Sequence, residues 1–201
     1  MIRVLVAEDQ AMVRGALKSL LAPESDIEVV AEAARGDEVV KLARQTHPDV
    51  ALLDIEMPGL DGISAAAALR GEMPSCRSLI LTTFGKPGFL RRAMDAGAFG
   101  FLLKDAPSHE LARAIRRTAA GERVVDPGLA ASALAEGLSP LSERERQVLA
   151  ATDRGADVEE IARTLFLSKG TVRNHLSTAI QKLGARNRAE AAKIAGSKGW
   201  L

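Results

Sequence analysis

The sequence predicts an α/β domain with a doubly wound, five-stranded parallel sheet, followed by an all-α domain of four helices. Short apolar runs alternate with helix-length amphipathic runs up to about residue 121, and no strand pattern occurs after residue 138. Residues 138–201 carry 11 Lys or Arg against 7 Asp or Glu, whereas the preceding residues carry 16 against 19. The basic final part therefore points to a polyanionic partner for that part alone.

Five strands are predicted where short apolar runs lie between turn signals, at residues 2–7, 27–33, 50–54, 77–83 and 99–103. The runs at 50–53 and 79–81 are apolar without interruption, as is typical of parallel strands buried on both faces. Helical spacing of apolar residues predicts the intervening helices, at residues 12–21, 39–43, 63–69, 90–96 and 111–120. Five such units predict a parallel sheet with helices on both faces.

The composition bounds the class of protein. The chain has 201 residues, of which 47% are hydrophobic and 26% charged, so it is long enough and apolar enough for one or two packed domains. No apolar run approaches the ~18 residues of a membrane span, so we expect no membrane partner. The single cysteine, Cys76, excludes an internal disulfide and a cysteine-based metal site, which predicts a cytoplasmic protein.

Charged and hydroxyl side chains gather at the predicted strand ends. Glu8 and Asp9 follow the first strand, Asp54 ends the third, Thr82 ends the fourth and Lys104 follows the fifth. Ligands of such sheets bind beyond the carboxyl ends of the strands, so these groups are expected to meet at one edge. Carboxylate oxygens without His or Cys favour Mg²⁺, and an ammonium suits a phosphoryl group. The pattern predicts a phosphoryl-transfer site with Asp54 as nucleophile.

Each of these residues also has an ordinary interpretation. Asp9 is well placed to cap the following helix, Asp54 to lie in an exposed loop, and Lys104 to be a solvated surface lysine. Thr82 is equally typical of a β-branched strand residue, and Thr83 competes with it for the hydroxyl role. Their coincidence at four strand ends favours the common site.

At these positions the chain resembles the receiver domain of bacterial two-component response regulators. The resemblance covers the first ~120 residues and is carried by Glu8-Asp9, Asp54, Met57-Pro58-Gly59-Leu60-Asp61-Gly62, Thr82 and Lys104-Asp105. It implies that Asp54 accepts a phosphoryl group from a sensor histidine kinase. It implies Mg²⁺ held by Glu8, Asp9, Asp54 and the backbone carbonyl of Glu56, and phosphoryl oxygens contacted by Thr82 or Thr83 and by Lys104. Phe101 would be the switching aromatic residue, unless it is simply a core strand residue.

The chain departs from the pattern of many receivers at two places. The acidic pair after the first strand is Glu8-Asp9 rather than two aspartates, which keeps the charge and the capacity to bind a metal. Asp105 follows Lys104 where many receivers have proline, so no cis-proline is expected there.

The end of the first domain leads into a linker. We expect a receiver domain over residues 1–121, a linker over 122–138 and a second domain over 139–201. Within the linker, Asp126-Pro127 predicts a helix entry and residues 129–136 a short helix. The sequence leaves open whether this helix packs on one of the domains.

Four helices are predicted in the second domain. Ser142 and Glu145 have the spacing of a capping box, Asp157 and Ser168 are expected to cap the next two helices, and Arg188 opens the last. A helix, a short turn and a capped helix with basic residues at its start is the helix-turn-helix arrangement, whose second helix enters the major groove. Residues 169–183 are thus predicted to read DNA.

The predicted recognition helix carries two kinds of candidate contact. Arg and Asn side chains read base edges, whereas Lys, Thr and His more often bind phosphates. We expect Lys169, Arg173, Asn174 and Ser177 on its outer side, and Lys169, Thr171, His175 and Lys182 near phosphates. A generic helix with a solvated basic face is the ordinary alternative.

The second domain resembles the output domain of the LuxR/NarL class over residues ~139–201. The motifs are Leu141-Ser142-Glu143-Arg144-Glu145, Glu160-Ile161-Ala162, Leu165, Leu167-Ser168, Thr171-Val172-Arg173-Asn174-His175 and Lys182-Leu183-Gly184. Together the two domains resemble a NarL/FixJ-type response regulator. The resemblance implies double-stranded operator DNA as partner and a homodimer that forms on phosphorylation. It implies pairing through the last helix at Ala189, Ala192, Lys193 and Gly196, unless these small residues pack within one chain.

The predicted function is therefore a phosphorylation-switched transcriptional regulator with no substrate turnover. One alternative is an enzyme like the haloacid-dehalogenase phosphatases, but Glu56 stands where those enzymes have a second aspartate. A DNA-binding protein with a vestigial receiver is another, and the presence of all the expected site residues speaks against it. An interaction-only receiver conflicts with the helix-turn-helix pattern.

Overall fold

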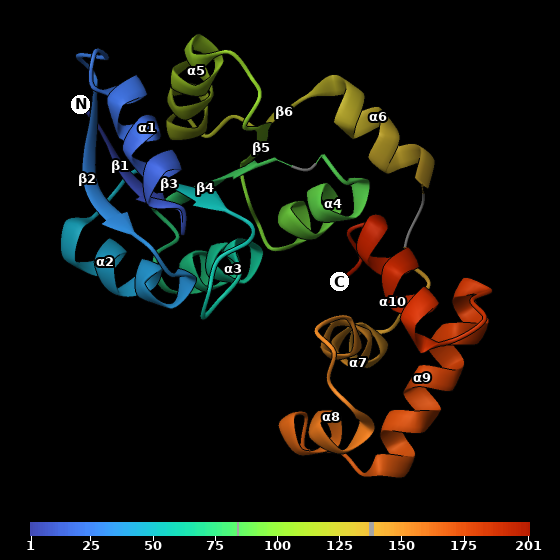
Figure 1. Cartoon of the computed structure of the whole chain (residues 1–201). Helices are drawn as coiled ribbons and strands as arrows, with labels where there is room; N and C mark the ends of the chain where they lie inside the picture. Colours follow the sequence, from blue (N-terminus) through green and yellow to red (C-terminus); the bar gives the residue numbers. More distant parts are fainter. Residues whose placement is uncertain (84, 137–138) are drawn as a thin grey trace. The chain divides into compact units, whose positions relative to one another are not determined.

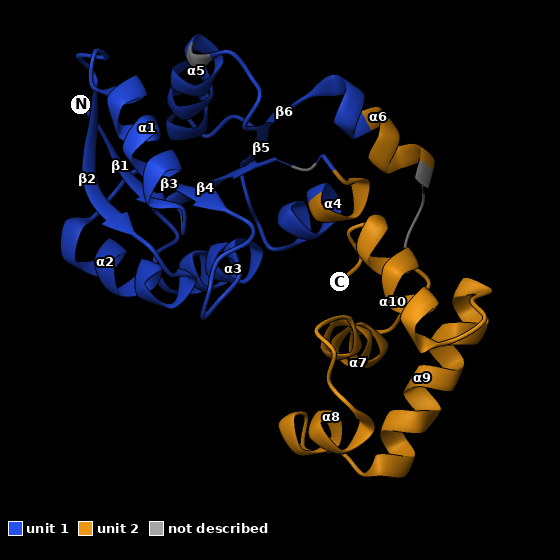
Figure 2. Cartoon of the chain, in the orientation of Figure 1, with its two compact units in different colours: residues 1–85, 90–130 blue, residues 86–89, 131–201 orange. Residues whose placement is uncertain are grey.

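The computed structural model describes residues 1–83, 85–136 and 139–201 and divides into two compact units (Figure 2). The first unit comprises residues 1–85 and 90–130, and the second comprises residues 86–89 and 131–201. The predicted linker is thus shared between the units, and residues 137–138 at its end lie outside the described part of the chain.

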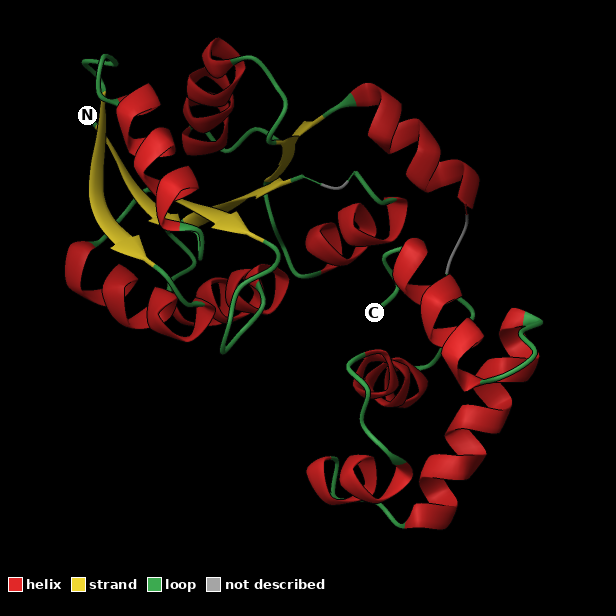
Figure 3. Cartoon of the chain, viewed as in Figure 1, coloured by secondary structure: helices red, strands yellow, loops and turns green. Residues whose placement is uncertain are grey.

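The first unit is built on one parallel sheet (Figures 1 and 3). In the described residues the strand order is β2-β1-β3-β4-β5-β6, and every neighbouring pair is parallel. The strands are β1 (Ile2–Ala7), β2 (Ile27–Ala33), β3 (Val50–Asp54), β4 (Arg77–Thr82), β5 (Gly100–Leu103) and β6 (Val124–Val125). The doubly wound parallel sheet is confirmed, with β3 and β4 at its centre.

The sixth strand corrects the prediction of five. β6 falls in the segment that the sequence assigned to the linker, and it pairs with the outer side of β5 through Gly100↔Val124 and Phe101↔Val125. Two residues are too few to show an apolar alternation, so the sequence pattern held no signal for this strand.

Helices cover both faces of the sheet. α1 (Ala11–Leu21) and α5 (Ser108–Ala119) lie on one face, and α2 (Val39–Thr46) and α3 (Gly62–Glu72) lie on the other (Figure 1). The short 3-10 helix η1 (Gly36–Glu38) precedes α2, and α4 (Pro87–Asp95) follows β4. The core under α1 and α5 contains Leu17, Leu21, Leu111 and Ile115 against alternate residues of the strands. This packing fixes the sheet, and with it the strand ends that carry the candidate site.

The second unit contains the predicted four helices, preceded by α6 (Pro127–Glu136). They are α7 (Glu143–Asp153), α8 (Val158–Thr164), α9 (Lys169–Leu183) and α10 (Arg188–Ser197). Their common core includes Val148, Leu149, Ile161, Val172 and Trp200. The described helices are all too short or too polar to cross a membrane.

The ends of these helices follow the capping chemistry of the sequence. Ser142 and Glu145 form the predicted capping box, and Asp157 and Ser168 accept backbone N–H bonds at the starts of α8 and α9. Gly184 ends α9 in the left-handed conformation, with φ 62°. Of these caps, Ser168 marks the point where α9 begins after the turn from α8.

Candidate functional site

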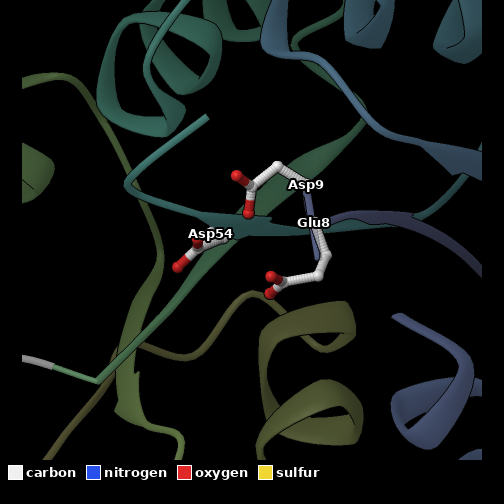
Figure 4. A group of neighbouring side chains, drawn as sticks. All are labelled: Glu8, Asp9 and Asp54. Atoms are coloured by element: carbon white, nitrogen blue, oxygen red, sulfur yellow. The ribbon is translucent and has the colours of Figure 1, made fainter. Parts of the chain in front are cut away.

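Three carboxylates lie together beyond the carboxyl ends of β1 and β3 (Figure 4). Glu8, Asp9 and Asp54 each offer an oxygen atom, and these atoms lie within 4.8 Å of one another. Glu8 and Asp9 follow β1 directly, and Asp54 is the last residue of β3. These residues lie together because β1 and β3 are neighbours in the sheet, although Asp9 and Asp54 are 45 positions apart in the sequence.

Lys104 supplies the positive charge in this group. Its Nζ lies 2.7 Å from Glu8 Oε2 and 3.0 Å from Asp54 Oδ1. Glu8 is fully buried and Asp54 is 6% exposed, whereas Asp9 is exposed. One ammonium cannot balance three carboxylates, so the cluster keeps an excess of negative charge in a poorly solvated place. A divalent cation with oxygen ligands fits this donor set.

Burial and ion pairing act against each other in this cluster. Burial raises the pKa of Glu8 and of Asp54, although hydrogen bonds from Lys104 oppose the rise. Burial lowers the pKa of Lys104, but its hydrogen bonds to Glu8 and Asp54 outweigh that effect and the pKa is raised overall. Burial thus disfavours the charged form of both acids while Lys104 favours it, and an added divalent cation would favour it further.

The loop after β3 holds the end of that strand tightly. Gly62 N–H donates to the Ile55 carbonyl at 3.0 Å, and a Cβ at Gly62 would lie 1.8 Å from the carbonyl oxygen of Asp54. Asp61 caps α3 by accepting from the backbone N–H of Ser64. Glu56, exposed, lies in the same loop two residues beyond Asp54. The glycine is required because a side chain at this point would displace the backbone of Asp54.

Arg14 is a supporting residue that the sequence analysis missed. It lies on α1, and its Nη1 donates to the backbone carbonyl of Glu8 at 2.6 Å, while its Nε lies 3.6 Å from Glu32. The contact ties the β1–α1 junction to the helix that follows it. A basic residue one turn into that helix is too common a feature to have served as a signal.

The two neighbouring threonines occupy different environments. Thr82, at the end of β4, is 2% exposed, whereas the next residue, Thr83, is exposed. The Thr82 carbonyl accepts from the backbone N–H of Lys104 at 2.8 Å, which joins the ends of β4 and β5 at the carboxylate cluster. Phe101, on β5, is fully buried. This geometry favours Thr82 over Thr83 as the hydroxyl of the site.

The predicted recognition helix presents a polar outer side. Lys169, Arg173, Asn174 and Ser177 are exposed on α9, and Thr171 and His175 are half-buried. The Nζ of Lys169 lies 2.9 Å from Glu159 in an exposed ion pair. Ser168, the N-cap, accepts from the backbone N–H of Thr171 and lies 2.8 Å from the Thr171 hydroxyl.

Lys182 has a partner inside its own unit. Its Nζ donates to both carboxylate oxygens of Glu145, at 3.0 and 2.7 Å, and the same carboxylate accepts from the Ser142 backbone N–H at 2.7 Å. Glu145 is 5% exposed. Lys182 therefore ties the end of α9 to the start of α7, a structural role that the phosphate assignment from the sequence did not include.

The four dimer candidates on α10 do not share one exposed face. Ala192 is 1% exposed and belongs to the core of its own unit, so the expectation that it meets a second chain is corrected. Ala189 and Lys193 are exposed and Gly196 is half-buried. An alanine at helical spacing fits a core and an interface equally well, which is why the sequence did not separate the two.

Comparisons with known proteins agree with both halves of this description. Residues 4–116 match the response regulator receiver domain family, and residues 139–195 match the LuxR family of bacterial regulatory proteins. The chain is 44% identical over 201 residues to the transcriptional regulatory protein DesR of Bacillus subtilis, covering 100% of both chains. It is 38% identical over 200 residues to the response regulator RamR of Streptomyces coelicolor, covering 100% of this chain and 98% of that one.

Solved structures give the same result. The chain is similar to the response regulator ChrA of a heme-sensing two-component system, with a TM-score of 0.59, 36% identity and coverage of 100% of this chain and 98% of the other. It is also similar to RcsB, solved as two dimers bound to two parallel DNAs, with a TM-score of 0.65, 25% identity and coverage of 98% of each chain. The chain therefore belongs to the NarL/FixJ-type two-component response regulators, which join a receiver domain to a LuxR-type DNA-binding domain.

Proposed function

We propose that the chain is a transcriptional regulator switched by phosphorylation of Asp54. The observation that carries the proposal is the group of Glu8, Asp9, Asp54 and Lys104, in which Asp54 ends β3 beside the buried Glu8 and the exposed Asp9, with its Oδ1 3.0 Å from the lysine ammonium. A receiver domain over residues 1–121 would take up the signal, and an output domain over 139–201 would act on DNA in the cytoplasm. The phosphoryl donor implied by the family is a sensor histidine kinase.

The proposed chemistry is a single phosphoryl transfer. A carboxylate oxygen of Asp54 attacks the phosphorus of a phosphohistidine, so that a P–O bond forms while the N–P bond breaks and the imidazole leaves with the electron pair and takes up a proton. Lys104 and the Thr82 hydroxyl are placed to bind the phosphoryl oxygens. Glu8, Asp9, Asp54 and the Glu56 carbonyl would hold Mg²⁺, which supplies neutralising charge for the phosphoryl group.

The phosphoryl group would change the balance of charge at this edge of the sheet. The group carries about −1.5 to −2 charge, in place of the single negative charge of the Asp54 carboxylate, next to a lysine that already contacts two carboxylates. We propose that Lys104 and Thr82 move toward it, and that the buried Phe101 changes position with β5, so that a dimerisation surface forms. The family relation to a dimer on DNA supports this outcome.

The proposed output is operator binding by α9. The exposed Arg173 and Asn174 are the side chains suited to base edges, and Lys169, Ser177, Thr171 and His175 to the phosphates and groove edges around them. Lys182 is assigned to Glu145 instead. We propose no substrate turnover, since the transferred group stays on Asp54 until it is hydrolysed.

Light-scattering mass of the full chain tests the switch. With Mg²⁺ and beryllofluoride, wild type is expected to change from monomer to dimer, whereas Asp54→Asn stays monomeric. Glu28→Gln is the matched control, because it removes one exposed carboxylate from β2, outside the cluster, and is expected to dimerise as wild type does. A mass that is unchanged in wild type, or that rises in Asp54→Asn as well, would refute the proposed role of Asp54.

A further inference from the structure

Phe166 is an aromatic side chain that the fold leaves in water. It lies between α8 and α9 and is 95% exposed. The side chains on either side of it, Leu165 and Leu167, both pack against the core of the second unit. The side chain of Phe166 thus contributes almost nothing to the packing of the unit that contains it.

The backbone of Phe166 is also in an unfavourable conformation. Its φ is 55°, in the left-handed region that costs most residues free energy and that bulky side chains rarely adopt. The turn itself requires this conformation, because it brings the Leu167 N–H to the Ala162 carbonyl at 2.8 Å and returns the chain to the core. Glycine or asparagine would meet the requirement at lower cost. Phenylalanine is therefore unfavourable here for two reasons: its backbone is in the left-handed conformation, and its apolar ring is exposed to water.

The position of Phe166 indicates which interaction would offset these two unfavourable free energies. It lies two residues before Ser168, the N-cap of α9, and so beside the first turn of the helix that we propose reads DNA. Between Glu160 and Glu190 the sequence contains six Lys or Arg and no acidic residue. A segment rich in Lys and Arg that also presents an exposed aromatic ring fits a polyanion with apolar atoms, which describes DNA with its thymine methyl groups and deoxyribose rings.

We infer that Phe166 is a DNA-contacting residue whose ring packs on the apolar surface of the operator next to the segment read by α9. The inference rests on the proposed DNA-binding function and deepens it. The two apolar surfaces that DNA offers have different consequences. A thymine methyl contact would make Phe166 a specificity determinant at one base pair, whereas a deoxyribose contact would add affinity at any sequence.

Phe166→Asn is the decisive variant because it separates folding from binding. Asparagine tolerates the left-handed backbone, so the unfolding midpoint, followed through the fluorescence of the core residue Trp200, is expected to be unchanged or higher. Affinity is expected to fall roughly tenfold, the factor that partial burial of one aromatic ring supplies. The probe is the duplex that the full-length wild-type chain selects from a random-sequence pool with Mg²⁺ and beryllofluoride.

Two further variants sharpen the result. Leu134→Asn is the matched control, because it removes another apolar side chain, 80% exposed on α6, and is expected to leave affinity unchanged. Phe166→Trp keeps an aromatic ring, so it is expected to retain affinity. Because Trp200 is the one native tryptophan, the emission of the introduced residue is expected to change on addition of the duplex. The same duplex with deoxyuridine in place of thymine distinguishes the two contacts. If the ring contacts a thymine methyl group, this duplex binds wild type more weakly but binds Phe166→Asn as the thymine duplex does. If the ring contacts deoxyribose, the replacement does not change the affinity difference between the two proteins.

The outcomes separate this inference from the function on which it rests. If wild type selects a duplex and Phe166→Asn binds it with the same affinity, the ring does not contact DNA and the inference is wrong while the function stands. An affinity loss accompanied by a lower unfolding midpoint would also overturn it, because the role would then be structural. If wild type selects no duplex at all, the proposed DNA-binding function fails and the inference fails with it.

Discussion

Gly62→Ala is the sharpest test of how the fold positions the phosphoacceptor. A Cβ at residue 62 would lie 1.8 Å from the carbonyl oxygen and 2.8 Å from the carbonyl carbon of Asp54. Real Cβ atoms stay at least 3.0 Å from such atoms, so the two backbone segments must separate by about 1.2 Å. Both contacts are with backbone, so no flexible side chain can move away to make room.

Two magnitudes follow from this displacement. Overpacking of a tightly packed site costs about 1–3 kcal/mol of folding free energy. A misplacement of about 1 Å at a reacting group costs on the order of 100-fold in rate. The rate of Asp54 phosphorylation by phosphoramidate with Mg²⁺ is thus expected to fall by about that factor, and amide exchange in β3 and at the start of α3 to become faster.

Gly15→Ala is the matched control for the same chemical change. Gly15 lies in the interior of α1, and nothing lies within 4 Å of a Cβ built there. Alanine in an exposed helix interior stabilises by about 0.5–1 kcal/mol relative to glycine, so this variant is expected to be more stable and to be phosphorylated at the wild-type rate. If Gly62→Ala is phosphorylated as fast as wild type, the close approach of Gly62 does not set the position of Asp54.

Two other predictions concern ion pairs. The hydrogen bond from Arg116 lowers the pKa of Asp26 to about 2, so the pair stabilises the folded state above the ordinary value near 3.8, and that stabilisation is lost as the pH falls from about 4 toward 2. Asp26→Asn is expected to flatten this part of the pH dependence in acid unfolding followed by circular dichroism, and an unchanged slope would contradict the assignment. Lys182→Met is expected to cost about 1 kcal/mol in urea unfolding followed by Trp fluorescence, with little change in operator affinity, because its partner is Glu145. Arg173→Ala is expected to show the reverse, with weaker operator binding at unchanged stability. Equal losses of affinity in the two variants would indicate that Lys182 does contact DNA.

The sheet and the acidic site were predictable because their signals are local. A strand buried on both faces reads as a continuous apolar run, and a charged residue at its end marks the carboxyl edge without any knowledge of the neighbouring strands. Topology then does the assembly, since parallel strands place all such ends at one edge. This is why Asp54 and Lys104 were expected near each other from positions 50 residues apart.

The features that were missed depend on tertiary neighbours. β6 is defined by its pairing with β5, not by its own two residues. The pairing of Lys182 with Glu145 follows from the packing of α9 on α7, and the burial of Ala192 follows from which side of α10 meets the core. In each case the residue type suits two environments equally, so the sequence lacks the information that the packing supplies.

The two candidate functional regions share a physical property. At the sheet edge, the carboxyl groups of Glu8 and Asp54 are buried with one ammonium between them, and burial raises the pKa of both. In the output unit, Phe166 combines a left-handed backbone with an almost fully exposed ring. Folding alone would favour a neutral residue in the first place and a glycine or asparagine in the second. A cation with a phosphoryl group would offset the first cost and DNA the second, so each departure from the best-folding sequence points to the partner that compensates for it.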